Sequence, residues 1–193
     1  TLRQYEALVV NGKATCTASL AAVFTEAATV NGKLVNYPDE DVVLSGRSVK
    51  LDRTFLLRAQ ERLYWNERLF VAVDPKLDAA ALAAKGCRFA APKAVLAESL
   101  AETLALLFTE DTELVILPDG TAVVDDDLDL TAAALRRYGT KLYVLGDVTV
   151  SADCIAALGT LEFFPANGTV TLPQDAEETF CAIPDLAYDE LRV

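Results

Sequence analysis

Histidine is absent from the 193 residues, and its absence removes several classes of chemistry. Triads, metal sites and proton shuttles that depend on His are excluded for this chain. The four cysteines are far apart and include no CxxC pair, so zinc and iron–sulfur sites are not predicted. We expect Cys16, Cys87, Cys154 and Cys181 to be buried free thiols in apolar surroundings, and disulfides are the alternative.

Methionine is also absent, which indicates either a piece of a longer chain or methionines missing from the sequence. Basic residues are few: 17 Lys and Arg stand against 29 Asp and Glu, giving a net charge of -12. Such a surface repels phosphate backbones and anionic lipids, so we predict no nucleic-acid partner. No apolar run approaches the roughly 20 residues that span a bilayer, so no membrane insertion is expected.

No basic, apolar leader follows Thr1, so the cytoplasm is the default expectation for the location. A leader that has been removed would instead indicate the cell surface or secretion. The hydrophobic content is 52%, which predicts a folded chain with a sizeable core. We interpret residues 1–193 as a single repeat-built domain.

The repeat is clearest at 141–174. An apolar run ends at a turn, a second short run follows, and a cap residue opens a short helix that stops at Gly. The predicted caps along the chain are Ser19, Asp52, Asp74, Ser99, Thr131, Ser151 and Asp175. Four of their six intervals lie in the 20 to 29 residues expected of leucine-rich repeats. The Asn-Gly pair at 11–12 predicts a hairpin-type turn, the pair at 31–32 repeats it, and the pair at 167–168 predicts a turn.

The last third of the chain carries a resemblance to a known family. Cys154, Leu158 and Leu161 are followed by Pro173, Phe180 and Cys181. This pattern resembles a leucine-rich-repeat solenoid of the irregular bacterial kind. The resemblance implies a curved α/β solenoid with a parallel sheet, usually a binding role, and no catalytic residues to carry over. A doubly wound α/β fold is the alternative architecture, because it also alternates short strands with helices.

Candidate chemistry is sparse. Asp125, Asp127 and Asp129 have the spacing of the first ligands of a calcium loop, but Leu130 stands where that loop needs Gly. We therefore interpret the cluster as a solvated loop. No GxGxxG, GxxxxGK[ST] or GxSxG motif occurs, so no cofactor is predicted. Asn167 begins an Asn-Gly-Thr glycosylation acceptor, but we interpret it first as part of a turn.

The best candidate for a protein contact is Tyr64 and Trp65 with the nearby Arg68, because Trp, Tyr and Arg are enriched at binding hot spots. Packing of the sole Trp over a helix end is the structural alternative. We predict no catalytic, cofactor or metal residues.

Three functional hypotheses follow. The first is a non-enzymatic binding or scaffold module with an unknown protein partner. The second is a carboxylate-dependent enzyme, with or without a divalent metal, using Asp74, Asp119 and Asp147, which each follow a predicted strand. The third is a structural segment that self-associates, or joins further repeats, through a terminal edge strand at 191–193.

Overall fold

The computed structural model describes residues 8–193. It is a mixed α/β structure in which every described strand pair is parallel. The strands form seven sheets of two to four strands, with short helices between them. The doubly wound alternative predicts one open sheet, and this division into seven departs from it. None of the helices in the described residues is long and apolar enough to cross a membrane.

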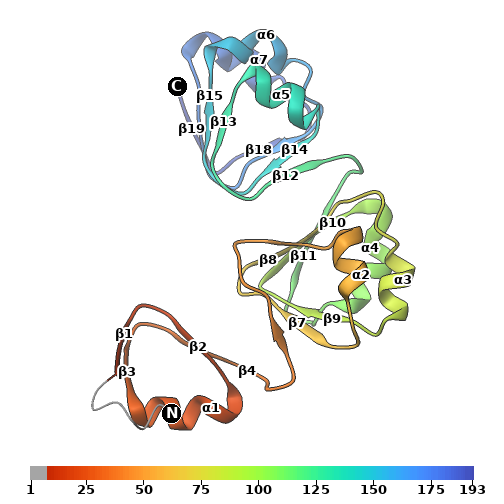
Figure 1. Ribbon diagram of the computed structural model, residues 1–193. Coiled ribbons are helices and arrows are strands. Elements are labelled where there is room, and N and C mark those ends of the chain that lie inside the picture. The colour runs from red at the N-terminus through yellow and green to blue at the C-terminus, as the bar shows by residue number, and fades with distance from the viewer. Residues whose placement is uncertain (1–7) are drawn as a thin grey trace.

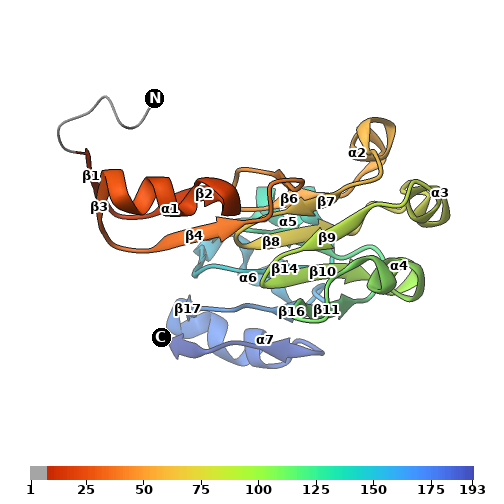
Figure 2. The ribbon, with the colours of Figure 1, turned by 90° about the horizontal axis from the view of Figure 1, so that it is seen from below.

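The sheets divide the chain into three blocks, because no described strand pairs with a strand of another block. Block 1 is 8–39, block 2 is 42–119 and block 3 is 120–193. Figure 1 shows them as three separate curled stretches, red, orange to green, and cyan to blue. Each block is built from successive passes of the chain, where a pass is one or two short strands, joined by a corner if there are two, and the helix that follows them, if there is one. The passes of a block lie one above the next, as Figure 2 shows for the helices of block 2.

Block 1 has two passes and one helix. Its elements are β1 (Leu8–Asn11), β2 (Ala14–Thr17), α1 (Ala18–Ala27), β3 (Ala28–Asn31) and β4 (Leu34–Tyr37). β1 pairs with β3, and β2 pairs with β4. The predicted hairpin at Asn11 and Gly12 is therefore wrong, because β1 and β2 do not pair with each other. The turn is a corner that leads the chain from one sheet to another. The same correction applies at 31–32, and the turn predicted at 167–168 is also a corner between two sheets. The sequence over 6–18 also predicts two short strand-like runs around the turn at 11–12, and residues 6 and 7 of the first run lie outside the described residues.

Block 2 makes four passes, and the last of them lacks a helix. Its elements are β5 (Val42–Val43), β6 (Val49–Lys50), α2 (Arg53–Arg58), β7 (Leu63–Trp65), β8 (Leu69–Ala72), α3 (Ala79–Ala84), β9 (Arg88–Ala90), β10 (Lys93–Ala97), α4 (Glu98–Leu104), η2 (Ala105–Leu107) and β11 (Glu113–Leu117). The sheet orders are β5-β7-β9 and β11-β10-β8-β6. A further parallel bridge joins Phe89 to Phe108.

Block 3 repeats the plan. Its elements are β12 (Ala122–Val124), β13 (Leu128–Leu130), α5 (Ala132–Tyr138), β14 (Leu142–Val144), β15 (Val148–Val150), η3 (Ala152–Cys154), α6 (Ile155–Leu158), β16 (Phe164–Pro165), β17 (Thr169–Thr171), η4 (Gln174–Ala176), α7 (Glu177–Cys181), β18 (Leu186–Ala187) and β19 (Glu190–Arg192). The sheet β13-β15-β17-β19 has four strands. The strand predicted at 191–193 is thus β19, and it is an edge of this sheet.

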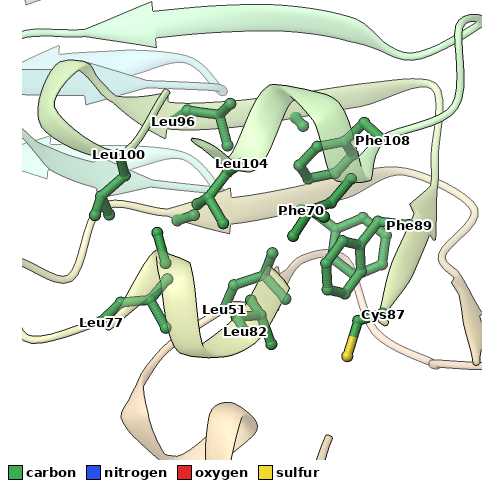
Figure 3. Packing of buried hydrophobic residues seen from close by; sticks show 14 of the residues in the cluster. Leu51, Phe70, Leu77, Leu82, Cys87, Phe89, Leu96, Leu100, Leu104 and Phe108 are labelled. Atoms are coloured by element: carbon green, nitrogen blue, oxygen red, sulfur yellow. The ribbon is translucent and has the colours of Figure 1, made fainter. Parts of the chain in front are cut away.

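Side-chain alternation along the strands builds the cores, because successive residues point to opposite faces. In β10, Ala94 and Leu96 point toward the helices of block 2 and Val95 points away. Rings of Phe70, Phe89 and Phe108 meet at the centre of this core, with centroids 5.2 to 5.9 Å apart (Figure 3). These short helices are marginal alone, so this packing is what stabilises them.

The core of block 3 is separate from that of block 2 and includes Cys154, Leu158, Phe164 and Phe180. All four cysteines are free, and three are buried as expected; the prediction is wrong for Cys181, which is exposed. The outer faces of blocks 2 and 3 pack against each other in a third cluster, made of Leu69, Val71, Val95, Leu117 and Tyr143. A sheet face that would otherwise be free for a partner is thereby covered.

Only two of the seven predicted caps are confirmed. Asp52 accepts a hydrogen bond from the backbone N–H of Phe55, and Thr131 accepts one from Ala134. Both are residues whose partner lies three positions ahead, as a helix N-cap requires. Ser151 precedes η3 without making a side-chain cap. The four predictions at Ser19, Asp74, Ser99 and Asp175 are wrong.

Two of these errors share one cause, which is that a helix is capped by the next pass of the chain. Ser19 lies inside α1, and its backbone N–H donates to Asp39 Oδ1 at 3.1 Å. Ser99 lies inside α4 and donates to Asp119 Oδ1 at 3.1 Å. Each carboxylate lies just after the last strand of its block, so it satisfies a helix N-terminus one pass back.

The ends of blocks 1 and 2 share a sequence motif. Residues 34–39 read LVNYPD and residues 114–119 read LVILPD. Ser19 and Ser99 are 80 positions apart, and so are Asp39 and Asp119. The spacing from the Ser to the Asp is therefore the same in both blocks. Pro38 and Pro118 follow the strand in both copies, where proline, which lacks an N–H, ends a sheet ladder. The motif therefore marks the end of a block, where no helix follows.

Candidate functional site

The three residues predicted as a protein contact do not form one surface. Tyr64 and Trp65 are consecutive in β7 and so point to opposite faces. Tyr64 is only 7% exposed, and its ring lies 5.2 Å from that of Phe55. Its hydroxyl accepts a hydrogen bond from the backbone N–H of Gln60 at 2.9 Å. Tyr64 is therefore a core residue of block 2.

Trp65 points outward and joins block 2 to block 1. Its ring stacks on Tyr37 with a centroid separation of 6.3 Å, and Lys13 Nζ lies 5.9 Å from the ring centroid. Lys13 also forms an ion pair with Glu67. Trp65 thus links block 1 to block 2. This resembles the alternative in which the Trp has a packing role, but the ring packs on Tyr37 and not over a helix end.

Arg68 is exposed beside a different pocket of about 340 Å³ between blocks 2 and 3. Arg47, Lys93 and Asp125 also line this pocket. Arg47 forms an ion pair with Asp126, and Ser48 donates a hydrogen bond to Asp125. The acidic cluster therefore ties block 3 to block 2, in addition to lying in a solvated loop.

The carboxylates named for an enzymatic role each accept a backbone hydrogen bond. Asp74 Oδ1 accepts from Lys76 at 2.9 Å, and Asp147 Oδ1 accepts from Thr169 at 2.8 Å. Asp119 accepts from Ser99, as described above. Within residues 8–193, no group of three or more Cys, Asp or Glu side chains has an arrangement that could hold a metal ion. The three carboxylates thus act in turns and caps.

An exposed apolar surface lies at the end of block 2. Leu114 and Ile116 of β11 are 37% and 56% exposed, and Leu106 of η2 is 79% exposed. Their neighbours in the sheet are covered by other residues, whereas Leu114 and Ile116 are not. Leu114 lies beside Ala94 and Ile116 beside Leu96 in the ladder, and both of those β10 residues are fully buried. We call Leu106, Leu114 and Ile116 the open end of block 2.

The open end exists because the final pass of block 2 has no helix. Helix α4 follows β10 and covers its apolar side chains, whereas β11 is followed by the turn at Pro118 and Asp119. β11 is also an edge strand, since its only partner among the described strands is β10. The backbone N–H of Glu113 donates to Pro92 O on the β10 side. In a parallel ladder the groups of Leu114 and Ile116 then point to the free edge.

Acidic side chains surround this apolar surface. Glu110, Asp111, Glu113 and Asp119 are all exposed around β11. Two cations are nearby: Lys93 Nζ lies 3.4 Å from Glu113 Oε1, and Lys141 Nζ donates a hydrogen bond to the backbone oxygen of Asp119 at 3.3 Å. The hydrogen bond from the Ser99 backbone N–H lowers the pKa of Asp119, so this carboxyl is ionised at neutral pH. The open end therefore combines apolar contact area with a negative rim.

The opposite end of block 2 is open as well. A pocket of about 360 Å³ lies there, lined by residues that include Leu44, Phe55, Lys50 and Arg58. β6 is the other edge of the four-stranded sheet. On α2, Arg53, Leu57 and Arg58 are exposed. We call this surface the start of block 2, and its exposed helix face is basic.

Sequence reasoning missed the open end, although a signal for it is present. The LVNYPD and LVILPD motifs mark strands that no helix follows, and an apolar strand without a covering helix must expose one face. No family model, no curated protein and no solved structure matches this chain. The resemblance to leucine-rich repeats thus rests on the residues quoted above, and the function is argued from the surfaces of the molecule.

Proposed function

We propose that this protein is a leucine-rich-repeat-like solenoid that works as a non-enzymatic binding module, with the open end of block 2 as its protein contact. The parallel pairing of each strand with the strand one pass later supports the solenoid. Repeats of that kind bury their apolar faces only against neighbours. The unit at the end of a stack therefore either carries a polar cap or takes a partner.

The observation that carries the binding role is the exposure of Leu106, Leu114 and Ile116 beside an unpaired strand edge. Natural proteins protect such edges with charges, prolines or coverings, because a free apolar edge strand pairs readily with another chain. A partner strand that adds to β11 gains main-chain hydrogen bonds from the edge and apolar contacts from the side chains. The acidic rim favours a partner with basic residues beside its apolar ones.

Block 1 offers an internal control for this reasoning. Its last strand, β4, has Asn36 at the position that corresponds to Ile116. Asn36 accepts a hydrogen bond from the Cys16 thiol, with a sulfur to oxygen distance of 3.2 Å. A polar residue at this position gives the end of block 1 less apolar area to offer. Block 2 is thus the better candidate for a contact.

The test is site-specific photo-crosslinking in the cells that make the protein. A photoreactive residue replaces Ile116 in one variant and Val9, which is 57% exposed on block 1, in a matched control. We expect a discrete protein adduct from position 116 and none from position 9. Equal yields at the two positions, or no adduct at 116, would overturn the proposal.

The carboxylate-enzyme hypothesis has less support, because Asp74, Asp119 and Asp147 already accept backbone hydrogen bonds. Its metal form predicts a higher melting temperature at saturating Mg²⁺, Mn²⁺ or Ca²⁺. We expect no shift with any of the three ions, measured by differential scanning fluorimetry.

A further inference from the structure

We propose that the partner at the open end of block 2 is the start of block 2 of a second copy, so that copies associate head to tail. The inference rests on the proposed function and names its partner. The two surfaces are the two edges of one sheet, because the strand order is β11-β10-β8-β6. Placing β6 of a second copy beside β11 continues a parallel ladder that each block already contains.

The register of that junction follows from the ladder within the block. One inward column runs through Val49, Phe70, Ala94 and Leu114. Continuing it sets Leu114 of one copy beside Val49 of the next. The backbone groups also match. Leu51 N–H donates to Val71 O, so alternation turns the N–H and C=O of Lys50 to the free edge. The backbone N–H and C=O groups of Leu114 and Ile116 point to the free edge of β11, so donors and acceptors of the two strands would face each other across the junction.

The helix row of block 2 ends where this junction begins. A helix follows each of β6, β8 and β10, which are neighbouring strands about 4.8 Å apart, and none follows β11. β6 of a second copy would lie two strand steps from β10, or about 9.6 Å. Helix α2 of the second copy would then be the next helix beyond α4 in the row.

The charges of the two helices are complementary. The exposed residues of α4 include Glu98 and Glu102, and those of α2 include Arg53 and Arg58. Exposed apolar residues lie near both sets, with Leu106 at 79% exposure and Leu57 at 74%. A pairing between an acidic and a basic surface steers the encounter and disfavours pairing of two like ends. The contact is therefore heterologous, between different surfaces of the two copies.

The arrangement of the blocks is compatible with stacking block 2 of one copy on block 2 of another. Figure 1 looks nearly along the direction in which the strands of block 2 succeed one another, and the three blocks occupy separate areas of the view. A copy displaced along that direction keeps block 2 over block 2, and because block 3 extends past β11 at this end, block 3 of the copy would lie over block 3 as well (Figure 2). Figure 2 shows α2 and α4 at opposite ends of the helix row of block 2. A heterologous contact of this kind forms an open chain of copies.

The experiment uses two variants that each block one surface. Ile116→Asn gives the open end the residue that block 1 has at the same position. Lys50→Pro removes the N–H that would bond to the next copy, and proline is tolerated where an edge N–H faces solvent. Sedimentation velocity of the full chain measures association against concentration. We expect the wild type to form a ladder of oligomers, and each variant alone to associate about tenfold or more weakly.

The decisive sample is an equal mixture of the two variants. Each retains one intact surface, so the mixture should form heterodimers and stop at two copies. Lys50→Ala, which keeps the N–H, and Val9→Asn, which changes a similarly exposed residue, should associate like the wild type apart from a small charge effect for Lys50→Ala. Circular dichroism melts confirm that the variants are folded.

Two results would overturn the inference. One is a wild type that stays monomeric at the highest soluble concentration, and the other is a variant that associates as strongly as the wild type. If the wild type is monomeric while position 116 crosslinks to a different protein in cells, the proposed function stands and only the second-copy partner fails. If position 116 crosslinks to nothing, both fail.

Discussion

Block 1 and block 3 use the same strand, corner, strand and helix plan, yet their interiors differ. Among the described residues of block 1, only Ala14 and Cys16 are buried apolar residues, and α1 buries none of its side chains. Block 3 fully buries Phe164 and Phe180. The two-stranded sheets of block 1 give each pass one neighbour, whereas the inner passes of block 3 have two. The number of stacked passes, more than their composition, decides how much core each pass obtains.

The largest expected effect is a difference in the free energy of unfolding between two Phe→Ala variants, one in block 3 and one in block 1. Phe180→Ala in block 3 should cost about 3–5 kcal/mol of the free energy of unfolding, because it leaves a cavity at a fully buried position. Phe24→Ala in the half-buried α1 should cost about 1 kcal/mol, since little packing is lost. Urea denaturation followed by circular dichroism measures both. Equal costs would mean that block 1 has a core as complete as that of block 3.

A second comparison uses one substitution in two settings. Gly168→Ala in block 3 places a Cβ 2.7 Å from Gly146 O, a clash between backbones of successive passes, and should cost about 2 kcal/mol. Gly12→Ala in block 1 meets no atom within 4 Å but forces φ +119 on a residue with a side chain, at a cost of about 1 kcal/mol. Gly159→Ala, with φ -65, should be nearly neutral. Thermal melts rank the three variants, and the reverse order would contradict the comparison.

A third prediction concerns the link between block 1 and block 2. Trp65→Ala removes the stack on Tyr37 and the contact with Lys13, and should cost about 1 kcal/mol. The loss should fall on block 1, whose amides should exchange faster while those of block 3 do not change. Hydrogen exchange with mass spectrometry resolves the blocks. Uniform acceleration across all three blocks would mean that the Trp supports block 2 instead.

The smallest effect is a pH dependence shared by Asp39 and Asp119. The Ser19 and Ser99 backbone N–H groups lower the pKa of these carboxyls. A lowered folded-state pKa gives stability that is present above the unfolded pKa, about 3.9, and is lost as the pH falls through the folded value. Asp119→Asn should flatten the acid side of the stability curve slightly, and Asp39→Asn should do so for block 1. Identical curves for wild type and variants between pH 2 and 5 would show that the caps carry no charge effect.

Local signals in the sequence predicted what local contacts determine. Asp52 and Thr131 are read correctly as caps because their donors lie three residues ahead. Ser19 and Ser99 are misread because the acceptor lies 20 residues away, on the next pass. The short strands and helices were predicted from rhythm, whereas the parallel sheet was implied by the resemblance to leucine-rich repeats, and the parallel pairing agrees with that expectation.

The candidate site was not predictable in the same way. Tyr64, Trp65 and Arg68 looked like one patch because they are close in sequence, but strand alternation and the next corner send them to three places. The exposure of Ile116 depends on which strand follows and whether a helix covers it. That information lies in the order of the passes, and only the repeated Pro-Asp ending carries a trace of it in the sequence.

The short-range pairing of the strands has a mechanical consequence. Each described strand pairs with one about 20 residues away, as Leu8 does with Ala28 and Leu142 with Ala122, so no strand pair within residues 8–193 joins one block to another. A force applied between the two ends of the described chain is carried in series through the blocks. Under tension the protein should lengthen in discrete steps, one block at a time. The first step should release block 1. The turns that follow β4 and β11 are the boundaries of the blocks, so they should set how many residues, and hence how much length, each step releases.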